Sequence, residues 1–222
     1  MDEARKTAPL GHSSQFCRIV DVVESKENVF LFFSEARWSS TLMSLVTSSA
    51  LTECQSRTIF VQLVRAVKAC HANDIVLRDL KLPSVLVDAS LERVWLSDFR
   101  YADVIPAGER ISDRRGSPAY VAPEMMRPGA YCGRKADMWS LGVILYKMLS
   151  GNYPFVHIDL KELFRRIRMQ EPAELPASVS DEAKDLVEML LCKAPDQRAG
   201  IADILKHPWI AQDEDQLVPD MP

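Results

Sequence analysis

The feature that most constrains this chain is a series of short motifs that follow one another in a fixed order. Arg78–Lys81 comes after a long run with helical periodicity, and the pair Asp98-Phe99 comes after two short strand-like runs. Ala122–Glu124 then precedes an apolar helical stretch that begins near Asp137. A dipeptide such as Arg-Asp means little alone, because it recurs by chance. Several such motifs in one order, at consistent spacing, restrict the chain to very few folds.

The periodicity of apolar residues predicts a mainly helical chain with a few short strands. Apolar residues at i, i+3, i+4 and i+7 predict one long helix that ends near Asn73. Thr52 and Gln55 fit a capping box at its start. Further helices are expected over 137–150, 159–169, 180–191 and 201–206, and strands over 18–23, 29–33, 85–87 and 94–96. The stretch 98–124 has no periodicity, which is typical of a long functional loop.

Together the motifs resemble the C-lobe of a protein kinase, from its hinge to its final helix. The resemblance implies an α+β, protein-kinase-like fold, mainly the helical C-lobe with a remnant N-lobe β-hairpin. We therefore expect four segments: a flexible leader at 1–15, remnant N-lobe strands at 16–33, a kinase-like C-lobe at 34–210 and an acidic tail carrying a linear motif at 211–222.

Composition limits the other classes of protein that the chain could represent. Its 222 residues suffice for one core and are too few for two ordinary domains. A net charge of -4 argues against a nucleic-acid partner or an anionic membrane surface. The five cysteines include no Cys-x-x-Cys pair, so neither a disulfide framework nor a metal site is expected. With no apolar signal segment at the start, we expect the protein in the cytoplasm and nucleus.

The resemblance also implies where the groups for phosphoryl transfer would stand. Asp79 occupies the catalytic-base position, Lys81 that of its partner, and Asp98 that of a metal-binding aspartate. Ser84 stands where a metal-binding asparagine belongs, and its hydroxyl is a shorter and weaker ligand than a carboxamide oxygen. Arg100 replaces the glycine that follows Asp-Phe, and this restricts a backbone that must turn freely.

The sequence also lacks the N-lobe motifs with which a kinase binds the phosphates of ATP. No Gly-x-Gly-x-x-Gly precedes the hinge-like Ser34-Glu35, and Lys6 and Lys26 lie in no suitable strand. Removing one preorganised transition-state contact typically costs about 10²–10³ in rate. We therefore expect no active catalytic residue, only vestigial ones, and weak or absent binding of ATP and magnesium. Such residues can persist as hydrogen-bonding members of the loop core: Asp79, Lys81, Ser84 and Asp98.

Two alternatives stay open at this point. The first is that the chain is a truncated form of an active ATP-dependent serine/threonine protein kinase. The second is a switch that binds Mg-ATP through Asp98 without turnover. A longer form with a Gly-rich loop and a strand lysine would favour the first alternative, and a thermal shift with Mg-ATP would favour the second.

Other positions of the kinase motifs are interpreted as structural. Glu124 is expected to pair with Arg198, as a fold-stabilising ion pair of the kinase scaffold. The arginine pair at 114–115 either meets an acidic partner or is simply solvated. The remaining positions are read as loop anchors or core: Arg78, Asp137 and Trp139.

Among inactive kinase relatives, the chain resembles the Tribbles family. Val76–Leu82 carries the leucine, Leu77, that Tribbles catalytic loops have in place of histidine. Gly116–Glu124 fits the Tribbles activation segment. Asp98-Phe99 departs from the family, whose members commonly have Ser-Leu-Glu-like residues there. The chain is therefore identified as a less degenerate or divergent relative.

The acidic tail is similar to a Tribbles tail motif that binds the beta-propeller of the constitutive-photomorphogenic E3 ubiquitin ligase. An extended segment with a stiff proline, one apolar anchor and flanking acids suits docking of this kind. Without the resemblance, the same residues would read as a solubilising end. The residues implied are Asp213, Glu214, Gln216, Leu217, Val218, Pro219 and Asp220.

The resemblance thus implies an adaptor without catalysis. The C-lobe, with the 98–124 segment, would hold a client such as a CCAAT/enhancer-binding transcription factor while the tail recruits the ligase, so that tethering promotes ubiquitylation. MAPK kinases are further partners expected from the family, with Pro208-Trp209 contributing to their binding.

Overall fold

A computed structural model describes residues 19–24, 29–33, 40–48 and 50–211 of this chain. The first two ranges are an antiparallel pair of strands, β1 (Ile19–Glu24) and β2 (Val29–Phe33), in which Glu24 pairs with Val29. Both predicted strands are therefore present, β1 displaced by one residue. The predicted leader at 1–15 and the tail from 212 onward lie outside the described residues.

The long predicted helix is α3 (Glu53–Ala72), and it begins where the capping box predicted. The Thr52 hydroxyl accepts a hydrogen bond from the Gln55 amide, and the Gln55 side chain accepts one from the Thr52 amide. These contacts satisfy two of the amides that a helix start leaves without partners. One face of the helix is buried along its length, as its apolar periodicity requires.

Short strands lie beside α3 and carry the loops of the site. β3 (Ser40–Thr41), β5 (Val85–Val87) and β6 (Val94–Leu96) form an antiparallel sheet in the order β3-β5-β6. β4 (Ile75–Val76) pairs with β7 (Asp103–Val104). The Gln62 side chain of α3 hydrogen-bonds Glu92 O and Val94 N, which fixes the β5–β6 turn against the helix. β5 and β6 have the bounds predicted from the sequence.

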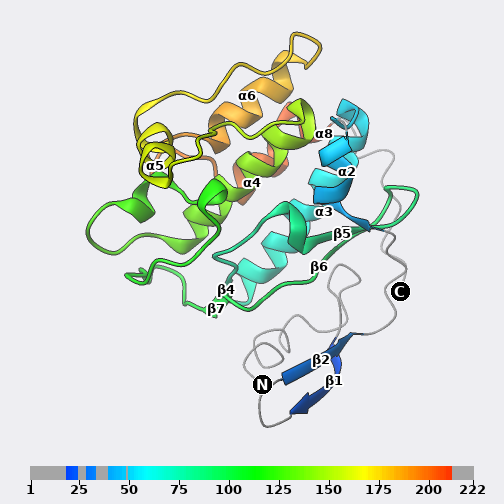
Figure 1. Ribbon diagram of the computed structural model, residues 1–222, viewed down its shortest axis with the longest axis vertical. Coiled ribbons are helices and arrows are strands. Elements are labelled where there is room, and N and C mark those ends of the chain that lie inside the picture. The colour runs from blue at the N-terminus through cyan, green and yellow to red at the C-terminus, as the bar shows by residue number, and fades with distance from the viewer. Residues whose placement is uncertain (1–18, 25–28, 34–39, 49, 212–222) are drawn as a thin grey trace.

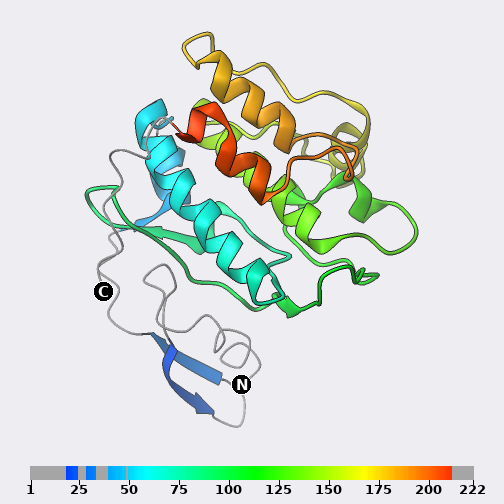
Figure 2. The same cartoon turned by 180° about the vertical axis from the view of Figure 1, so that it is seen from behind.

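The remaining helices form the bulk of the lobe. They are α2 (Leu42–Ser48), α4 (Gly133–Ser150), α5 (Leu160–Met169), α6 (Asp181–Leu190), α7 (Ile201–Lys206) and α8 (Pro208–Ala211). α4 lies in the middle, with α3 and α6 packed against it, and α7 and α8 close the same layer from behind (Figures 1 and 2). This mixed but mainly helical architecture is the kinase-like, C-lobe-dominated fold that the motifs predicted.

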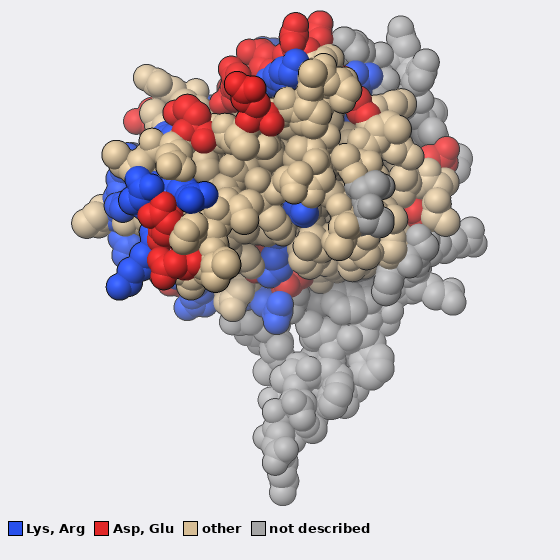
Figure 3. Space-filling view, turned by 45° about the horizontal axis from the view of Figure 1, so that its top comes forward, with Lys and Arg blue, Asp and Glu red and all other residues tan. Residues whose placement is uncertain are grey.

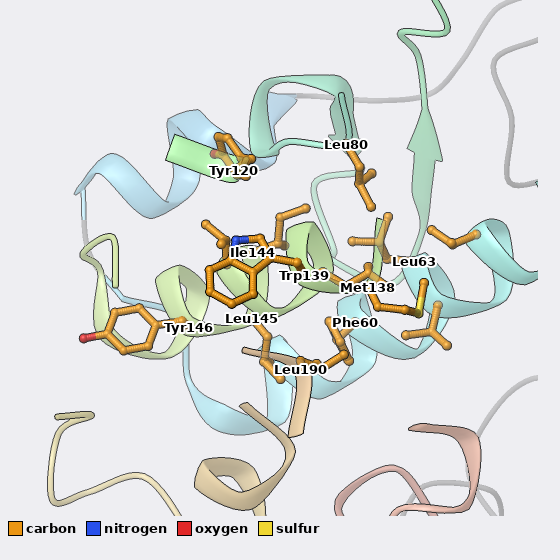
Figure 4. Close-up of a cluster of buried hydrophobic side chains, with 14 of the residues drawn as sticks. Phe60, Leu63, Leu80, Tyr120, Met138, Trp139, Ile144, Leu145, Tyr146 and Leu190 are labelled. Atoms are coloured by element: carbon orange, nitrogen blue, oxygen red, sulfur yellow. The ribbon is translucent and has the colours of Figure 1, made fainter. Parts of the chain in front are cut away.

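The core surrounds α4, whose side chains are buried on nearly every face. Trp139 is fully buried, as predicted, and stacks on Phe155 with ring centroids 6.0 Å apart. Side chains from α3 and α6 complete the cluster around it (Figure 4). Gly142 allows α6 to approach, because a Cβ there would lie 2.8 Å from Leu190 Cβ. Among the helices of the described chain, none combines the length and apolarity needed to cross a bilayer.

The structure corrects the sequence-based boundaries at several places. α4 begins at Gly133, four residues before the predicted start at Asp137. Its polar first turn is held by tertiary contacts: Arg134 pairs with Asp74 at 2.6 Å, and Lys135 donates to Arg198 O at 2.5 Å. α2 and α8 were not predicted. The 98–124 segment is not wholly irregular, since it contains β7 and the short 3-10 helices η3 (Pro118–Tyr120) and η4 (Pro123–Met126).

Candidate functional site

The loop between β4 and the 3-10 helix η2 (Leu82–Ser84) is anchored from below by Asp137 of α4. One carboxylate oxygen of Asp137 accepts the Arg78 amide at 2.9 Å. The other accepts the Leu77 amide at 2.9 Å and faces His71 Nε2 at 2.8 Å. Arg78 has a left-handed backbone, with φ 65°, which is unusual for a residue with a side chain. Asp137, read from the sequence as a loop anchor, thus holds this turn in place.

Asp79 and Lys81 of this loop contact each other and the activation segment. Lys81 Nζ pairs with an Asp79 oxygen, and it donates to the Ser117 hydroxyl at 3.3 Å. The Ser117 amide donates to the other Asp79 oxygen at 2.6 Å. Both residues are largely buried. They are therefore integrated members of the loop core, one of the two roles considered from the sequence.

Ser84, at the metal-binding asparagine position, uses its hydroxyl locally. Ser84 Oγ donates to Lys81 O at 3.0 Å, and the residue is buried at the end of η2. This places a short, engaged hydroxyl where a kinase presents a carboxamide oxygen to magnesium. The described chain contains no group of three or more His, Cys, Asp or Glu side chains that could hold a metal ion.

Asp98 follows β6 and is held by Arg100, the residue that replaces glycine. Arg100 Nε and Nη2 donate to the two carboxylate oxygens at 3.0 and 2.8 Å, and the Arg100 amide donates at 3.2 Å. Lys81 Nζ lies 3.9 Å from Asp98 Oδ2. Burial opposes ionisation of Asp98, but the bonds from Arg100 outweigh it, so the pKa of Asp98 is lowered. Asp98 is thus ionised and already has a cationic partner on both oxygens.

Arg78 connects the loop to the first part of the 98–124 segment. Its guanidinium donates to Asp113 Oδ2 at 2.8 Å and lies 3.6 Å from Asp103, while the Tyr131 hydroxyl donates to Asp113 O at 3.0 Å. The hydrogen bond from Arg78 lowers the pKa of Asp113. Arginine–phosphate pairs order the activation loops of kinases after phosphorylation. Here a permanent carboxylate makes a contact of the same kind.

Asp113 is a residue of the site that the sequence motifs did not predict. The sequence offers one signal for it, an acid three positions before Gly116 in a segment rich in arginine. Motif matching does not use that signal, because it depends on knowing that Arg78 faces this part of the loop. The acid and its arginine lie 35 positions apart in the sequence.

The end of the activation segment is fixed to the lobe by the predicted ion pair. Both terminal nitrogens of Arg198 donate to the two Glu124 oxygens, at 2.7 and 2.8 Å, and both side chains are buried. Arg114 is exposed, and backbone groups at the end of the segment hold its guanidinium. It donates to the backbone oxygens of Met125 and Arg127 at 2.7 and 2.6 Å, while Arg115 pairs with Asp113 at 2.8 Å.

The structure therefore brings the kinase-motif residues together. Arg78, Asp79, Lys81, Ser84 and Asp98 converge at the activation segment, with Asp137 beneath them. The proposed ligase-binding residues, 213–220, lie outside the described residues.

Replacing Arg100 with alanine is expected to free the Asp98 carboxylate for a cation. Because Arg100 is two-thirds exposed, its ion pair is worth little, and the expected gain in Mn²⁺ affinity is about three- to tenfold. Free Mn²⁺, followed by electron paramagnetic resonance during a titration, measures this directly. Arg110→Ala removes an exposed arginine of the same segment and serves as the matched control. Equal affinities in the two variants would contradict the role assigned to Arg100.

Comparison with known proteins gives a consistent result. The protein kinase domain family matches residues 1–210. Tribbles homolog 2 of Mus musculus is 35% identical over 228 residues, covering 96% of this chain, and the Bos taurus protein has the same values. The chain spans just under two thirds of these relatives, 66% of their length. A probable serine/threonine-protein kinase, MARK-A of Dictyostelium discoideum, is 32% identical over 200 residues, which are 90% of this chain and 19% of that protein.

Proposed function

Because this chain belongs to the protein kinase family and is a kinase-like protein of the Tribbles type, we propose that it acts as a catalytically inactive pseudokinase scaffold. The observation that carries the proposal is that both magnesium-ligand positions are engaged within the chain: Arg100 donates to both oxygens of Asp98, and the Ser84 hydroxyl, at the asparagine position, donates to Lys81 O. Phosphoryl transfer depends on an aspartate that neutralises charge through magnesium. An aspartate that is already neutralised by its own chain is poorly suited to that role.

Binding of ATP and magnesium is accordingly proposed to be weak or absent. Magnesium requires near-octahedral oxygen ligands, supplied in kinases by this aspartate and a nearby asparagine. In this chain Ser84 donates its hydroxyl to Lys81 O, and Asp98 accepts from Arg100. The donor set therefore fits magnesium poorly.

We further propose that the tail recruits an E3 ubiquitin ligase of the constitutive-photomorphogenic type. The support is the sequence itself: paired acids at Asp213-Glu214, then Gln216, Leu217 and the run Val218–Asp220. In the sequence these residues come two positions after the end of α8. α8 is anchored because Trp209 Nε1 donates to Glu53 at 2.8 Å.

The lobe would hold the client that the ligase modifies. The 98–124 segment is an ordered surface, tied to the lobe at Asp113 and at Glu124. A transcription-factor client of the CCAAT/enhancer-binding class and MAPK kinases are the partners we propose. Trp209 does not contribute to the binding of MAPK kinases as expected from the sequence, because its side chain is fully buried; of the pair, only Pro208 is exposed. Cytoplasm and nucleus are the compartments in which these partners act.

The tail proposal predicts a specific loss of binding. The purified chain is expected to bind the ligase propeller domain with a dissociation constant of about 1 μM, an affinity typical of linear motifs. Val218→Ala with Pro219→Ala should abolish binding, because the apolar anchor and the stiffening proline are both lost. Isothermal titration calorimetry measures both proteins. Alanine at Met221 and Pro222 is the matched tail control, and equal weak binding by every protein would refute the proposal.

The retained Asp79, Lys81 and Asp98 favour one second candidate, a truncated form of an active serine/threonine protein kinase. The similarity to MARK-A supports it as well. The deciding experiment is a phosphate-transfer assay on the chain and on any longer product that carries a Gly-rich loop. Phosphate transfer that is lost in the Asp79→Ala variant would establish an active kinase. If no phosphate transfer is detected, the scaffold proposal stands.

A further inference from the structure

Of the serines and threonines whose side chains the structure describes, two are exposed and make no hydrogen bond: Ser112 and Ser178. Ser112 lies beside Asp113, which Arg78 holds at 2.8 Å, so its part of the chain is fixed to the lobe. Ser178 lies in the loop between α5 and α6, residues 170–180, which contains no helix or strand. Of these two hydroxyls, that of Ser178 is therefore the more accessible to a modifying enzyme.

The α5–α6 loop presents Ser178 from a short turn. The Val179 amide donates to Pro176 O at 3.0 Å, and this bond closes the turn over 176–179. Residues 176–178 are exposed, whereas Val179 is buried and fixes the end of the turn to the lobe. Exposed loop tips are the parts of a folded chain that enzymes reach most readily, because opening them disturbs little of the core.

Acidic side chains surround this serine in the sequence. Glu171 and Glu174 precede Ser178, while Asp181 and Glu182 follow it in the first turn of α6, and all four acids are exposed. In Figure 3, acidic side chains gather at the upper edge of the view, and in Figure 1 the loop and α6 lie at the top of the lobe. A protein kinase whose substrate groove is basic is therefore attracted to this segment, and one whose groove is acidic is repelled.

Two residues after Ser178, the chain enters a junction of three helices. The Ser180 amide and hydroxyl donate to the two oxygens of Glu53 at 2.9 and 2.6 Å. Trp209 Nε1 donates to the same carboxylate at 2.8 Å, and Arg57 pairs with it at 3.5 Å. Because Ser180 is the N-cap of α6, Glu53 joins the first turn of α3, the start of α6 and the side chain that anchors α8.

The Glu53 junction is sensitive to added negative charge. Burial opposes ionisation of Glu53, but the hydrogen bonds from Ser180 and Trp209 outweigh it, so the pKa of Glu53 is lowered and the carboxylate is charged. A phosphate on Ser178 would add about 1.5–2 negative charges within two residues, a backbone span of at most about 7 Å. A phosphate before a helix often stabilises it, but the first turn of α6 already carries two acids, so repulsion dominates here.

We propose that Ser178 is a phosphorylation site for a serine kinase that recognises acidic substrates, and that its phosphate loosens the Glu53 junction. This kinase is a separate enzyme that transfers the γ-phosphoryl group of ATP. The bond between phosphorus and the ADP oxygen breaks, a bond to Ser178 Oγ forms, and the hydroxyl proton passes to the catalytic base of that kinase. The new charge repels Glu53 and weakens the bonds that hold Ser180 and Trp209. The inference goes beyond the scaffold function and does not depend on ligase recruitment.

The first experiment incubates the full chain with ATP and a purified serine kinase that prefers acidic substrates, and maps the phosphate by mass spectrometry. Phosphate is expected on Ser178 and not on Ser112. Asp181→Asn with Glu182→Gln keeps the shape of the segment but removes its charge, and should slow incorporation about tenfold. Glu188→Gln removes an exposed acid further along α6 and should leave the rate unchanged. A folded chain that gains no phosphate at Ser178 would overturn the proposal.

The second experiment compares hydrogen exchange of the tryptophan indoles, by nuclear magnetic resonance, before and after phosphorylation. The Trp209 indole should exchange about tenfold faster in the phosphorylated chain, while the buried Trp139 indole should not change and reports that the lobe stays folded. In Glu53→Gln the amide oxygen still accepts from Trp209 but carries no charge, so phosphorylation should leave the exchange rate unaltered. Phosphate on Ser178 without faster exchange at Trp209 would refute the effect on the junction.

Discussion

Replacing Arg198 with methionine is expected to lower the free energy of unfolding by about 3–5 kcal/mol, as is typical when one partner of a buried pair is removed. The arginine is fully buried and makes two bonds to Glu124. It also donates to Cys192 O at 2.9 Å and to Lys135 O at 2.6 Å, and it covers the Trp139 ring at 5.2 Å. Methionine fills much of the space but leaves the Glu124 carboxylate buried without a cation.

Urea unfolding followed by tryptophan fluorescence measures this loss. The double variant Glu124→Leu with Arg198→Met should be more stable than Arg198→Met alone, because it removes the unpaired carboxylate. Arg165→Met breaks an exposed pair with Glu162 and should change stability little. A single variant as stable as the parent would mean that Glu124 is compensated by another group.

Much of the fold was predictable because local sequence and tertiary structure agree. The Thr52–Gln55 capping box, the apolar face of α3 and the β-branched runs of β5 and β6 each specify their element locally. The first turn of α4 was not predictable, since Arg134 and Lys135 read as a polar loop. Their partners, Asp74 and Arg198, lie 60 or more residues away and become visible only in the folded chain.

The candidate site was likewise predictable in part from the sequence. The sequence motifs identified Asp79, Lys81 and Asp98 as residues of the site. They also showed that Arg100 stands where kinases have a glycine. They predicted that Arg100 would restrict the backbone, but not that its side chain would return to Asp98. Such a contact depends on a rotamer chosen by the surrounding loop, which no residue pattern encodes. The pair of Arg78 with Asp113 was missed for the same reason, whereas Glu124–Arg198 was found through the family resemblance.

Asp137 is expected to be as important for stability as Arg198, although it makes no ion pair with an arginine or lysine in the described chain. Asp137→Ala would leave the buried amides of Leu77 and Arg78 without acceptors. Each such donor costs about 1–3 kcal/mol, so the expected loss is about 2–6 kcal/mol. That is a large fraction of the 5–15 kcal/mol by which a typical domain is stable. The left-handed backbone at Arg78 would also lose its clamp.

Hydrogen exchange at Leu77 and Arg78 distinguishes this mechanism from a general loss of stability. In Asp137→Ala, both amides should exchange faster than the amides in the centre of α3, because the loop opens locally before the lobe unfolds. Asp159→Ala is the matched control, since it removes an exposed helix-capping carboxylate and should cost about 1 kcal/mol. If the two variants lost equal stability and the loop amides stayed protected, Asp137 would not be the anchor. The catalytic-loop geometry would then have to be maintained by Asp79, through its contacts with Lys81 and Ser117.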